Sequence, residues 1–148
     1  MSIEKDFEEI IKYAHLWNWS PDWNLVKDIY FNNPDSYSVL TPFAYSYLEE
    51  MIRTTTSEYS QPLFHNDELV RLQVGMGLIK LAKTENDDNI EYVRLLDKIK
   101  YHYDVRRIYD GNKRNYVLHG HRSPRFWSKE DFENLLHEIA LLSPYSKF

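Results

Sequence analysis

Residues 128–142 read Ser-Lys-Glu-Asp-Phe-Glu-Asn-Leu-Leu-His-Glu-Ile-Ala-Leu-Leu, and this stretch is the clearest guide to the fold. Its apolar residues recur every three or four positions, as on one face of an α-helix: Phe132, Leu135, Leu136, Ile139 and Leu142. Ser128 and Asp131 have the spacing of a capping box, and Trp127 can pack onto Phe132 as a hydrophobic staple. The spacing predicts a helix that begins just after Ser128.

The same helical period recurs through the rest of the chain. Helices are expected over about 3–19, 20–30, 41–54, 66–82, 90–109 and 113–118. Ser20-Pro21 and Thr41-Pro42 are interpreted as helix starts, and Asn66 or Asp67 as the cap of the fourth helix. Gly75 and Gly77 lie inside that fourth segment, which predicts close packing of a neighbouring helix. The threonines at 54–56 are expected to fray the end of the third.

No segment shows the sustained alternation of a β-strand, and no repeat or linker divides the chain. The expected fold is therefore all-α, a single domain over residues 1–148 built as a bundle of five to seven helices.

Composition excludes several classes of function. The 148 residues contain no cysteine, so disulfides, thiolate metal sites and cysteine nucleophiles are excluded. The charged N-terminal residues do not resemble a signal peptide, and no apolar run approaches the ~20 residues that span a bilayer. We therefore expect a cytoplasmic protein with no membrane association.

Charge is distributed unevenly along the chain. The net charge is −5, but the window from Lys98 to Lys129 contains nine basic and two acidic residues, a net +7 that leaves −12 elsewhere. A basic segment on an acidic body suits a localised polyanion site, because phosphate contacts supply much of the affinity for nucleic acid. The alternative is a solvated basic face offset by acidic neighbours.

Within this window, residues 112–122 read Asn-Lys-Arg-Asn-Tyr-Val-Leu-His-Gly-His-Arg. Arg114 is followed by Asn115, then, after three further residues, by His119 and Gly120. This pattern resembles the signature of the HEPN superfamily, in which an Arg and a polar residue precede a His by four to six intervening positions. Family members place it between a long helix and a final helix of a small bundle, which is the order of elements expected here. His121 also satisfies the spacing and remains an alternative to His119.

Residues of these types suit RNA cleavage for physical reasons. A ribose 2′-hydroxyl is a nucleophile already placed beside the phosphate, and a histidine can move its proton near neutral pH. An arginine can stabilise the charge that builds on the phosphate oxygens. No metal or other cofactor is required, and the sequence contains no His-Glu-x-x-His motif or aspartate cluster that would hold a metal.

The resemblance implies a metal-independent endoribonuclease with Arg114, Asn115 and His119 as catalytic residues. Basic residues expected to contact the RNA backbone are Arg106, Arg107, Lys113, Arg122 and Arg125. Five positions on an ideal helix place two side chains about 140° apart, so one regular helix cannot aim both Arg114 and His119 at one phosphate. HEPN sites are usually composed of two motifs across a dimer, which implies a homodimer. The family further suggests a role in stress response, phage defence or a toxin–antitoxin pair, with a cognate antitoxin or regulatory protein as a possible partner.

Other polar residues carry weaker signals. His15, His65, His102 and His137 have no partner at metal or triad spacing and are expected to be structural or exposed. Glu49 and Glu50 either supply a polar group to the site from across the bundle or form a solvated face with Arg53. Aromatic residues that could contact bases, or equally pack in the core, occur in two groups: Trp17, Trp19 and Trp23, and Tyr101, Tyr103 and Tyr109.

A second function remains open. If Arg114 is a surface ion-pair partner of Asp110 and His119 is structural, the chain is a catalytically silent helical adaptor or immunity-type protein. Its acidic body would then bind a protein partner. Oligomeric state separates the two hypotheses, because the nuclease requires a dimer.

Overall fold

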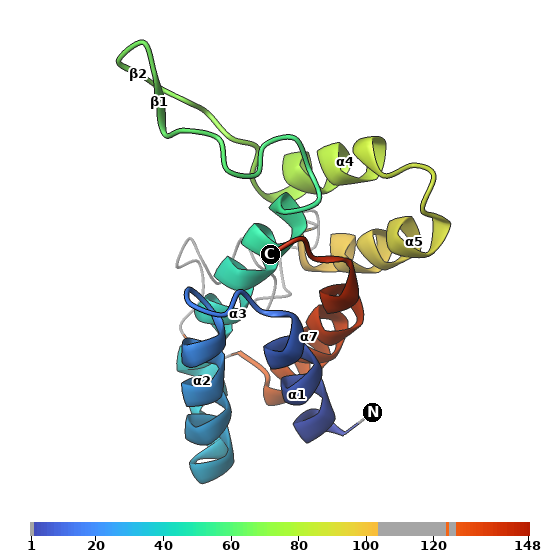
Figure 1. Cartoon of the computed structure of the whole chain (residues 1–148). Helices are drawn as coiled ribbons and strands as arrows, with labels where there is room; N and C mark the ends of the chain where they lie inside the picture. Colours follow the sequence, from blue (N-terminus) through green and yellow to red (C-terminus); the bar gives the residue numbers. More distant parts are fainter. Residues whose placement is uncertain (1, 104–123, 125–126) are drawn as a thin grey trace.

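The computed structural model describes residues 2–103, 124 and 127–148. In this part of the chain, six α-helices and one small β-hairpin form the fold (Figure 1). The α-helices are α1 (Ile3–Tyr13), α2 (Ser20–Asn32), α3 (Tyr37–Arg53), α4 (Gly75–Glu85), α5 (Ile90–Ile99) and α7 (Lys129–Leu142). Short 3-10 helices are η1 (Pro34–Ser36), η2 (Lys100–Tyr103) and η4 (Ser143–Tyr145). The all-α bundle expected from the sequence is confirmed.

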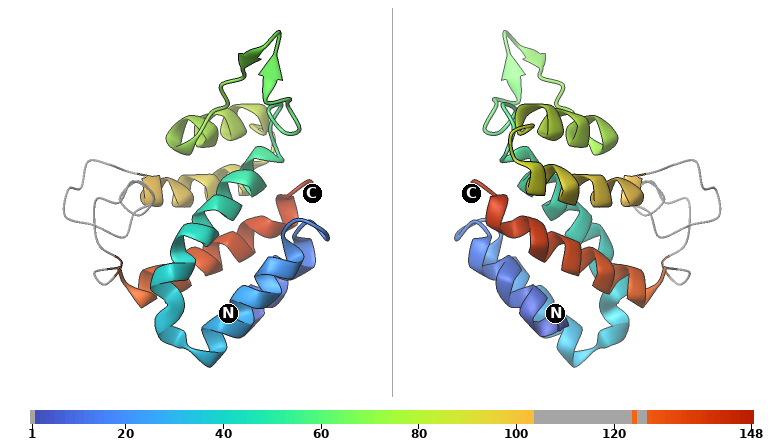
Figure 2. Two further views of the ribbon diagram at one scale, coloured as in Figure 1. Left: turned by 90° about the vertical axis from the view of Figure 1, so that its left-hand side faces the viewer. Right: turned by 90° about the vertical axis from the view of Figure 1, so that its right-hand side faces the viewer.

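The helices are arranged around α3 and α7. α1 and α2 lie at one end of the molecule, α4 and α5 lie at the other, and α3 and α7 run between them (Figure 2). The antiparallel hairpin, β1 (Phe64–His65) and β2 (Glu68–Leu69), projects beyond α4 (Figure 1). No helix in the described part of the chain has the length and apolar character needed to cross a bilayer.

One hydrophobic core draws residues from all six α-helices. α7 buries the whole apolar face that the sequence predicts. Its five residues are each at most 1% exposed: Phe132, Leu135, Leu136, Ile139 and Leu142. An aromatic group joins α1, α2 and α3, with the Trp23 ring 5.0 Å from Phe43 and 6.1 Å from Phe7 between centroids. Edge-to-face packing of this kind adds to the stabilisation from burial.

The ends of α7 and α2 follow the predicted signals closely. Ser128 caps α7 by accepting a hydrogen bond from the Asp131 backbone N–H at 3.2 Å. Pro21 lies in the first turn of α2, as predicted, although Ser20 is already helical and Trp19 is the cap. The first helix is shorter than predicted and ends at Tyr13. The following loop is held by His15, whose Nδ1 accepts from the N–H groups of Trp17 and Asn18 at 3.3 Å each.

The predicted start of α3 is wrong, whereas its predicted end near Thr54 agrees with the observed end at Arg53. The helix begins at Tyr37, so Pro42 lies inside it rather than at its start, because η1 leads directly into an additional helical turn. Its C-terminal end does not fray as predicted, because threonine hydroxyls bond to the last carbonyl groups. The hydroxyls of Thr54, Thr55 and Thr56 each donate to the carbonyl three residues earlier, at 2.6, 2.7 and 2.9 Å.

The fourth predicted helix is wrong over its first half. Asn66 and Asp67 have positive φ angles of 50° and 64°, so they form the turn of the hairpin instead of capping a helix. α4 begins at Gly75, whose own φ of 54° falls in the left-handed region that favours glycine. At Gly77 an added Cβ would meet only the Gln73 side chain, so helix packing is not the reason for this glycine.

The helix predicted for 90–109 is α5 up to Ile99, where the chain tightens into η2. The continuation to 109 and the predicted helix over 113–118 lie outside the described residues.

Candidate functional site

The residues that the sequence predicts to carry catalysis and RNA binding lie outside the described residues. They are Arg106, Arg107, Lys113, Arg114, Asn115, His119, His121, Arg122 and Arg125. What the structure describes is the bundle on either side of the segment 104–123, with Tyr103 at the end of η2 and Ser128 at the start of α7.

A largely buried polar cluster joins η2 to the bundle. His102 is 5% exposed, and each of its ring nitrogens has a partner on a different helix. Its Nε2 lies 2.5 Å from Oε2 of Glu138 on α7, and its Nδ1 lies 3.2 Å from the hydroxyl of Tyr45 on α3. We call these three residues the Tyr45–His102–Glu138 cluster. It links three elements that are far apart in the sequence.

An ionised carboxylate can only accept, so Nε2 of His102 donates to Glu138. This bond fixes the orientation of the ring, as carboxylates that bond to histidines do in catalytic and metal sites. Tyr45 is 1% exposed and His102 5%, whereas the Glu138 side chain is 24% exposed, so solvent reaches the cluster mainly at its carboxylate.

Glu49 lies one turn after Tyr45 on α3 and therefore shares its face. Glu49 is 9% exposed, so the predicted solvated face is wrong for this residue. Glu50 accepts from Trp19 Nε1 at 2.9 Å. Arg53 donates to the Gln73 carbonyl at 2.8 Å. The carboxylate of Glu49 is thus placed in the bundle interior, on the same side as Tyr45.

The other described histidines are structural or exposed, as expected from the sequence. His15 holds the loop after α1, and His65 is exposed in the hairpin. His137 lies on α7 next to Glu138 in sequence but bonds in another direction, to Asp6 on α1 at 3.1 Å. The Asp6 side chain is only 4% exposed. α7 therefore carries two histidine–carboxylate pairs that tie it to different elements.

The aromatic candidates separate into buried and exposed residues. Trp23 and Tyr103 are core residues at 0% and 2% exposure. Trp17 is 80% exposed and Tyr101 49%. Tyr109 lies outside the described residues. Trp19 is partly buried, with its Nε1 bonded to Glu50. Among the described members of the two predicted groups, Trp17 and Tyr101 are therefore the rings most open to a base.

Lysines at the two ends of the basic window are partly neutralised. Lys100 lies 3.4 Å from Asp97, and Lys129 lies 3.9 Å from Glu133. Asp97 also accepts from Lys83 at 2.6 Å, and this lysine lowers the pKa of the Asp97 carboxyl below its ordinary value. The described ends of the window therefore add less free positive charge than the sequence suggests.

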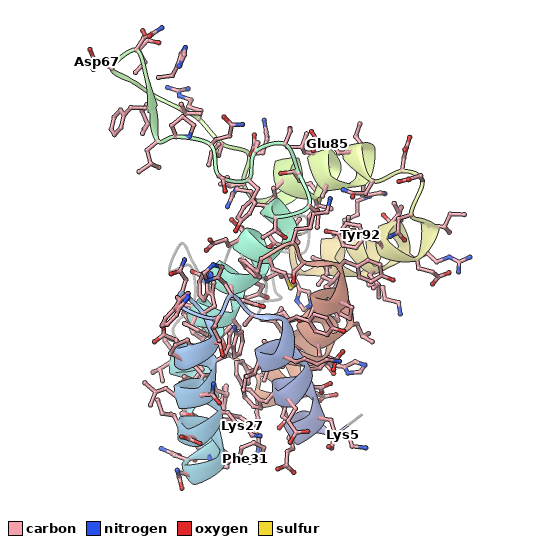
Figure 3. All side chains as sticks on the ribbon, viewed as in Figure 1. Lys5, Lys27, Phe31, Asp67, Glu85 and Tyr92 are labelled. Carbon is pink, nitrogen blue, oxygen red and sulfur yellow. The ribbon has the colours of Figure 1, made fainter. Side chains whose placement is uncertain are left out.

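A pocket of about 500 Å³ opens at the C-terminal end of α3, between Thr54 and Glu85 (Figure 3 labels Glu85). Its polar groups bond mainly to one another: Ser57 donates to Glu85 through its N–H at 2.6 Å and its hydroxyl at 2.5 Å. The Asn86 amide donates to the Thr55 carbonyl at 2.9 Å. Over the described residues, no group of three or more His, Asp or Glu side chains is arranged to hold a metal ion.

The Tyr45–His102–Glu138 cluster was not predicted. Its members are separated by 57 and 36 residues, so no spacing in the sequence connects them. Comparison of the chain with protein-family models, with curated proteins and with solved structures found no match.

Proposed function

We propose that this protein is a metal-independent endoribonuclease of the HEPN type that acts as a homodimer. The observation that carries the proposal is the sequence Arg114-Asn115-Tyr116-Val117-Leu118-His119-Gly120 between two elements of a helical bundle. α5 and η2 precede it and α7 follows it, which is the order in which HEPN proteins place the motif. The net charge of +7 between residues 98 and 129 further supports a polyanionic substrate.

In the proposed reaction, His119 accepts the proton of a ribose 2′-hydroxyl. The 2′-oxygen attacks the adjacent phosphorus, and the bond to the 5′-oxygen of the next nucleotide breaks as His119 passes the proton to that oxygen. The products are a 2′,3′-cyclic phosphate and a 5′-hydroxyl end. Arg114 stabilises the charge on the phosphate oxygens, and Asn115 orients the phosphate or the imidazole.

Around this centre, Arg106, Arg107, Lys113, Arg122 and Arg125 bind the RNA backbone. His121 is the alternative acid–base residue, because it too has the required spacing from Arg114. The dimer supplies a second motif to each centre. A function in stress response, phage defence or a toxin–antitoxin pair, with a cognate regulatory protein, is consistent with this chemistry.

The test is RNA cleavage by the purified protein in EDTA, with Arg114→Ala and His119→Ala beside the wild type. We expect cleavage that leaves 2′,3′-cyclic phosphate ends and a loss of about a hundredfold or more in each variant. His121→Ala decides between the two histidines. Cleavage that persists unchanged in both Arg114→Ala and His119→Ala contradicts the mechanism.

A second candidate is a non-enzymatic helical adaptor, and the hairpin favours it. Three large apolar side chains on and next to the hairpin strands are 60–67% exposed, which is typical of a surface that binds another protein: Leu63, Phe64 and Leu69. A monomer that forms a 1:1 heterocomplex insensitive to His119→Ala would support this function instead of the nuclease.

A further inference from the structure

The β1–β2 hairpin carries apolar side chains on a surface that its own bundle leaves uncovered. It projects beyond α4 in each view of the molecule (Figures 1 and 2). Phe64 and Leu69 are cross-strand partners, so their side chains lie on the same face of the hairpin. They are 60% and 64% exposed. A two-stranded hairpin is marginally stable alone, whereas further strands and a covered apolar face make a sheet stable.

The backbone hydrogen bonds show which edge of the hairpin is open to a further strand. The Val70 N–H bonds to the Leu63 carbonyl at 2.8 Å, so these two residues turn their backbone groups toward each other. Because bonded and non-bonded pairs alternate along an antiparallel ladder, Leu69 and Arg71 turn theirs away from β1. On β1, one of the outward positions is Pro62, which has no N–H to donate. β2 therefore offers the open edge.

The charges beside this edge complement one another under a two-fold axis. When two β2 strands pair antiparallel with Leu69 opposite Leu69 of the second copy, Arg71 of each copy lies beside Asp67 of the other. Asp67 and Arg71 are exposed, and neither forms an ion pair with any residue of its own chain that the structure describes. An axis at Glu68 would place two carboxylates against each other, and an axis at Val70 would place Leu69 opposite Arg71. The axis at Leu69 is therefore favoured.

We propose that the β2 edge binds the β2 edge of a second copy of this chain, which forms a four-stranded antiparallel sheet with a two-fold axis at Leu69. Phe64 and Leu69 of both copies form one apolar row across this sheet, between two Asp67–Arg71 ion pairs. The second copy is the occupant that fits, because the same two residues supply both halves of each ion pair. The inference goes beyond the proposed nuclease and does not rest on it. Since the contact is small, the dimer should dissociate on dilution.

Sedimentation velocity of the full 148-residue chain over a series of concentrations tests the apolar row. Leu69→Lys places two ammonium groups opposite each other at the axis and should raise the dimer dissociation constant at least about tenfold. Leu16→Lys is the matched control, because Leu16 is 69% exposed and lies in the loop after α1. It should leave the dissociation constant within about twofold of the wild-type value.

A charge exchange tests the ion pairs without relying on how well either variant folds. Arg71→Glu and Asp67→Lys each place like charges together at both ends of the two-fold contact, so each variant alone should associate roughly tenfold more weakly than the wild type. In an equal mixture, Asp67 of one variant meets Arg71 of the other, and the two introduced charges also attract. The mixture should therefore recover about the wild-type dissociation constant, which mixing two misfolded chains cannot produce.

The opposite results overturn the proposal. A wild-type chain that stays monomeric at every soluble concentration would leave the hairpin to a different protein partner. A dimer that Leu69→Lys and Leu16→Lys weaken equally, or do not weaken, would be formed by another surface. A mixture of Arg71→Glu and Asp67→Lys that does not recover would exclude the axis at Leu69. None of these outcomes depends on RNA cleavage, so the proposed nuclease is judged separately.

Discussion

Tyr92 on α5 shows how a single buried phenol couples stability to pH. Its side chain is 2% exposed, bonds to Thr55 Oγ1 at 2.9 Å and stacks on Tyr145 with ring centroids 5.0 Å apart. Burial raises the pKa of Tyr92 to about 12. Burial also raises the pKa of Tyr47 and of Tyr30, whose hydroxyl bonds to Glu133.

These shifts predict a loss of stability at alkaline pH. A phenol whose pKa is higher in the folded state stabilises the fold fully below its ordinary pKa of about 10. The contribution of Tyr92 falls as the pH rises from about 10 to 12, because the unfolded chain ionises first. We expect a denaturant midpoint that drops between about pH 10 and 12, and a shallower drop in Tyr92→Phe.

At pH 8, Tyr92→Phe should also cost about 1 kcal/mol through the lost bond to Thr55. Tyr101→Phe, at a side chain that is 49% exposed, is the control. If the denaturant midpoint falls equally steeply with pH in Tyr92→Phe and the wild type, Tyr92 ionises equally easily in the folded and unfolded states.

The helical spacing of apolar residues is enough to predict individual core residues, but it does not predict which polar residues pair. Burial repeats every three or four residues along a helix, so Phe7, Ile10 and Leu96 are visible as core positions in the sequence and are all 0% exposed. His102 carries no such signal, since its partners depend on how η2, α3 and α7 meet. From the sequence, His102 is therefore expected only to be structural or exposed, and nothing links it to Glu138.

Among the elements, the hairpin is the clearest case in which turn chemistry prevailed over an apparent helical pattern. Asn66 and Asp67 join Phe64–His65 to Glu68–Leu69 as a two-residue turn with both φ angles positive. Asn and Asp are the non-glycine residues that tolerate this conformation best, and they are also common helix caps. Whether Asn66 and Asp67 form a hairpin turn or cap a helix depends on whether the flanking residues pair as strands. The local sequence pattern does not determine this.

Substitution of Asp67, at the tip of the hairpin in Figure 3, tests this turn. Asp67→Gly removes the steric cost of the left-handed conformation, while Asp67→Val raises it by about 1–2 kcal/mol. We expect slower amide exchange at Val70, whose N–H bonds to the Leu63 carbonyl at 2.8 Å, in the glycine variant and faster exchange in the valine variant. The helical circular dichroism and unfolding midpoint should stay constant, because no hairpin residue belongs to the core. A large fall in the midpoint of Asp67→Val would show that the hairpin is coupled to the bundle.

For the whole molecule, the sequence predicted the helical bundle because six apolar helical faces require one another for burial. It could not predict the projecting hairpin or the depth of Glu49, since both depend on contacts between distant segments. The uneven charge is likewise a property of the whole chain: a window of +7 on a remainder of −12 would restrict the proposed RNA substrate to one region.

The proposed homodimer predicts how the specific activity depends on protein concentration. If each nuclease centre requires a motif from both subunits, activity per chain depends on the fraction of chains that are dimeric. Dilution through the dimer dissociation constant should therefore lower the specific activity in proportion to the fraction of chains that are dimeric. Initial cleavage rates, beside sedimentation velocity at the same concentrations, measure this. The salt concentration must be held fixed, because phosphate contacts weaken steeply as salt rises and would mimic dissociation. A specific activity that is constant while sedimentation shows dimers converting to monomers would establish that one subunit holds a complete centre, and the composite site would have to be abandoned.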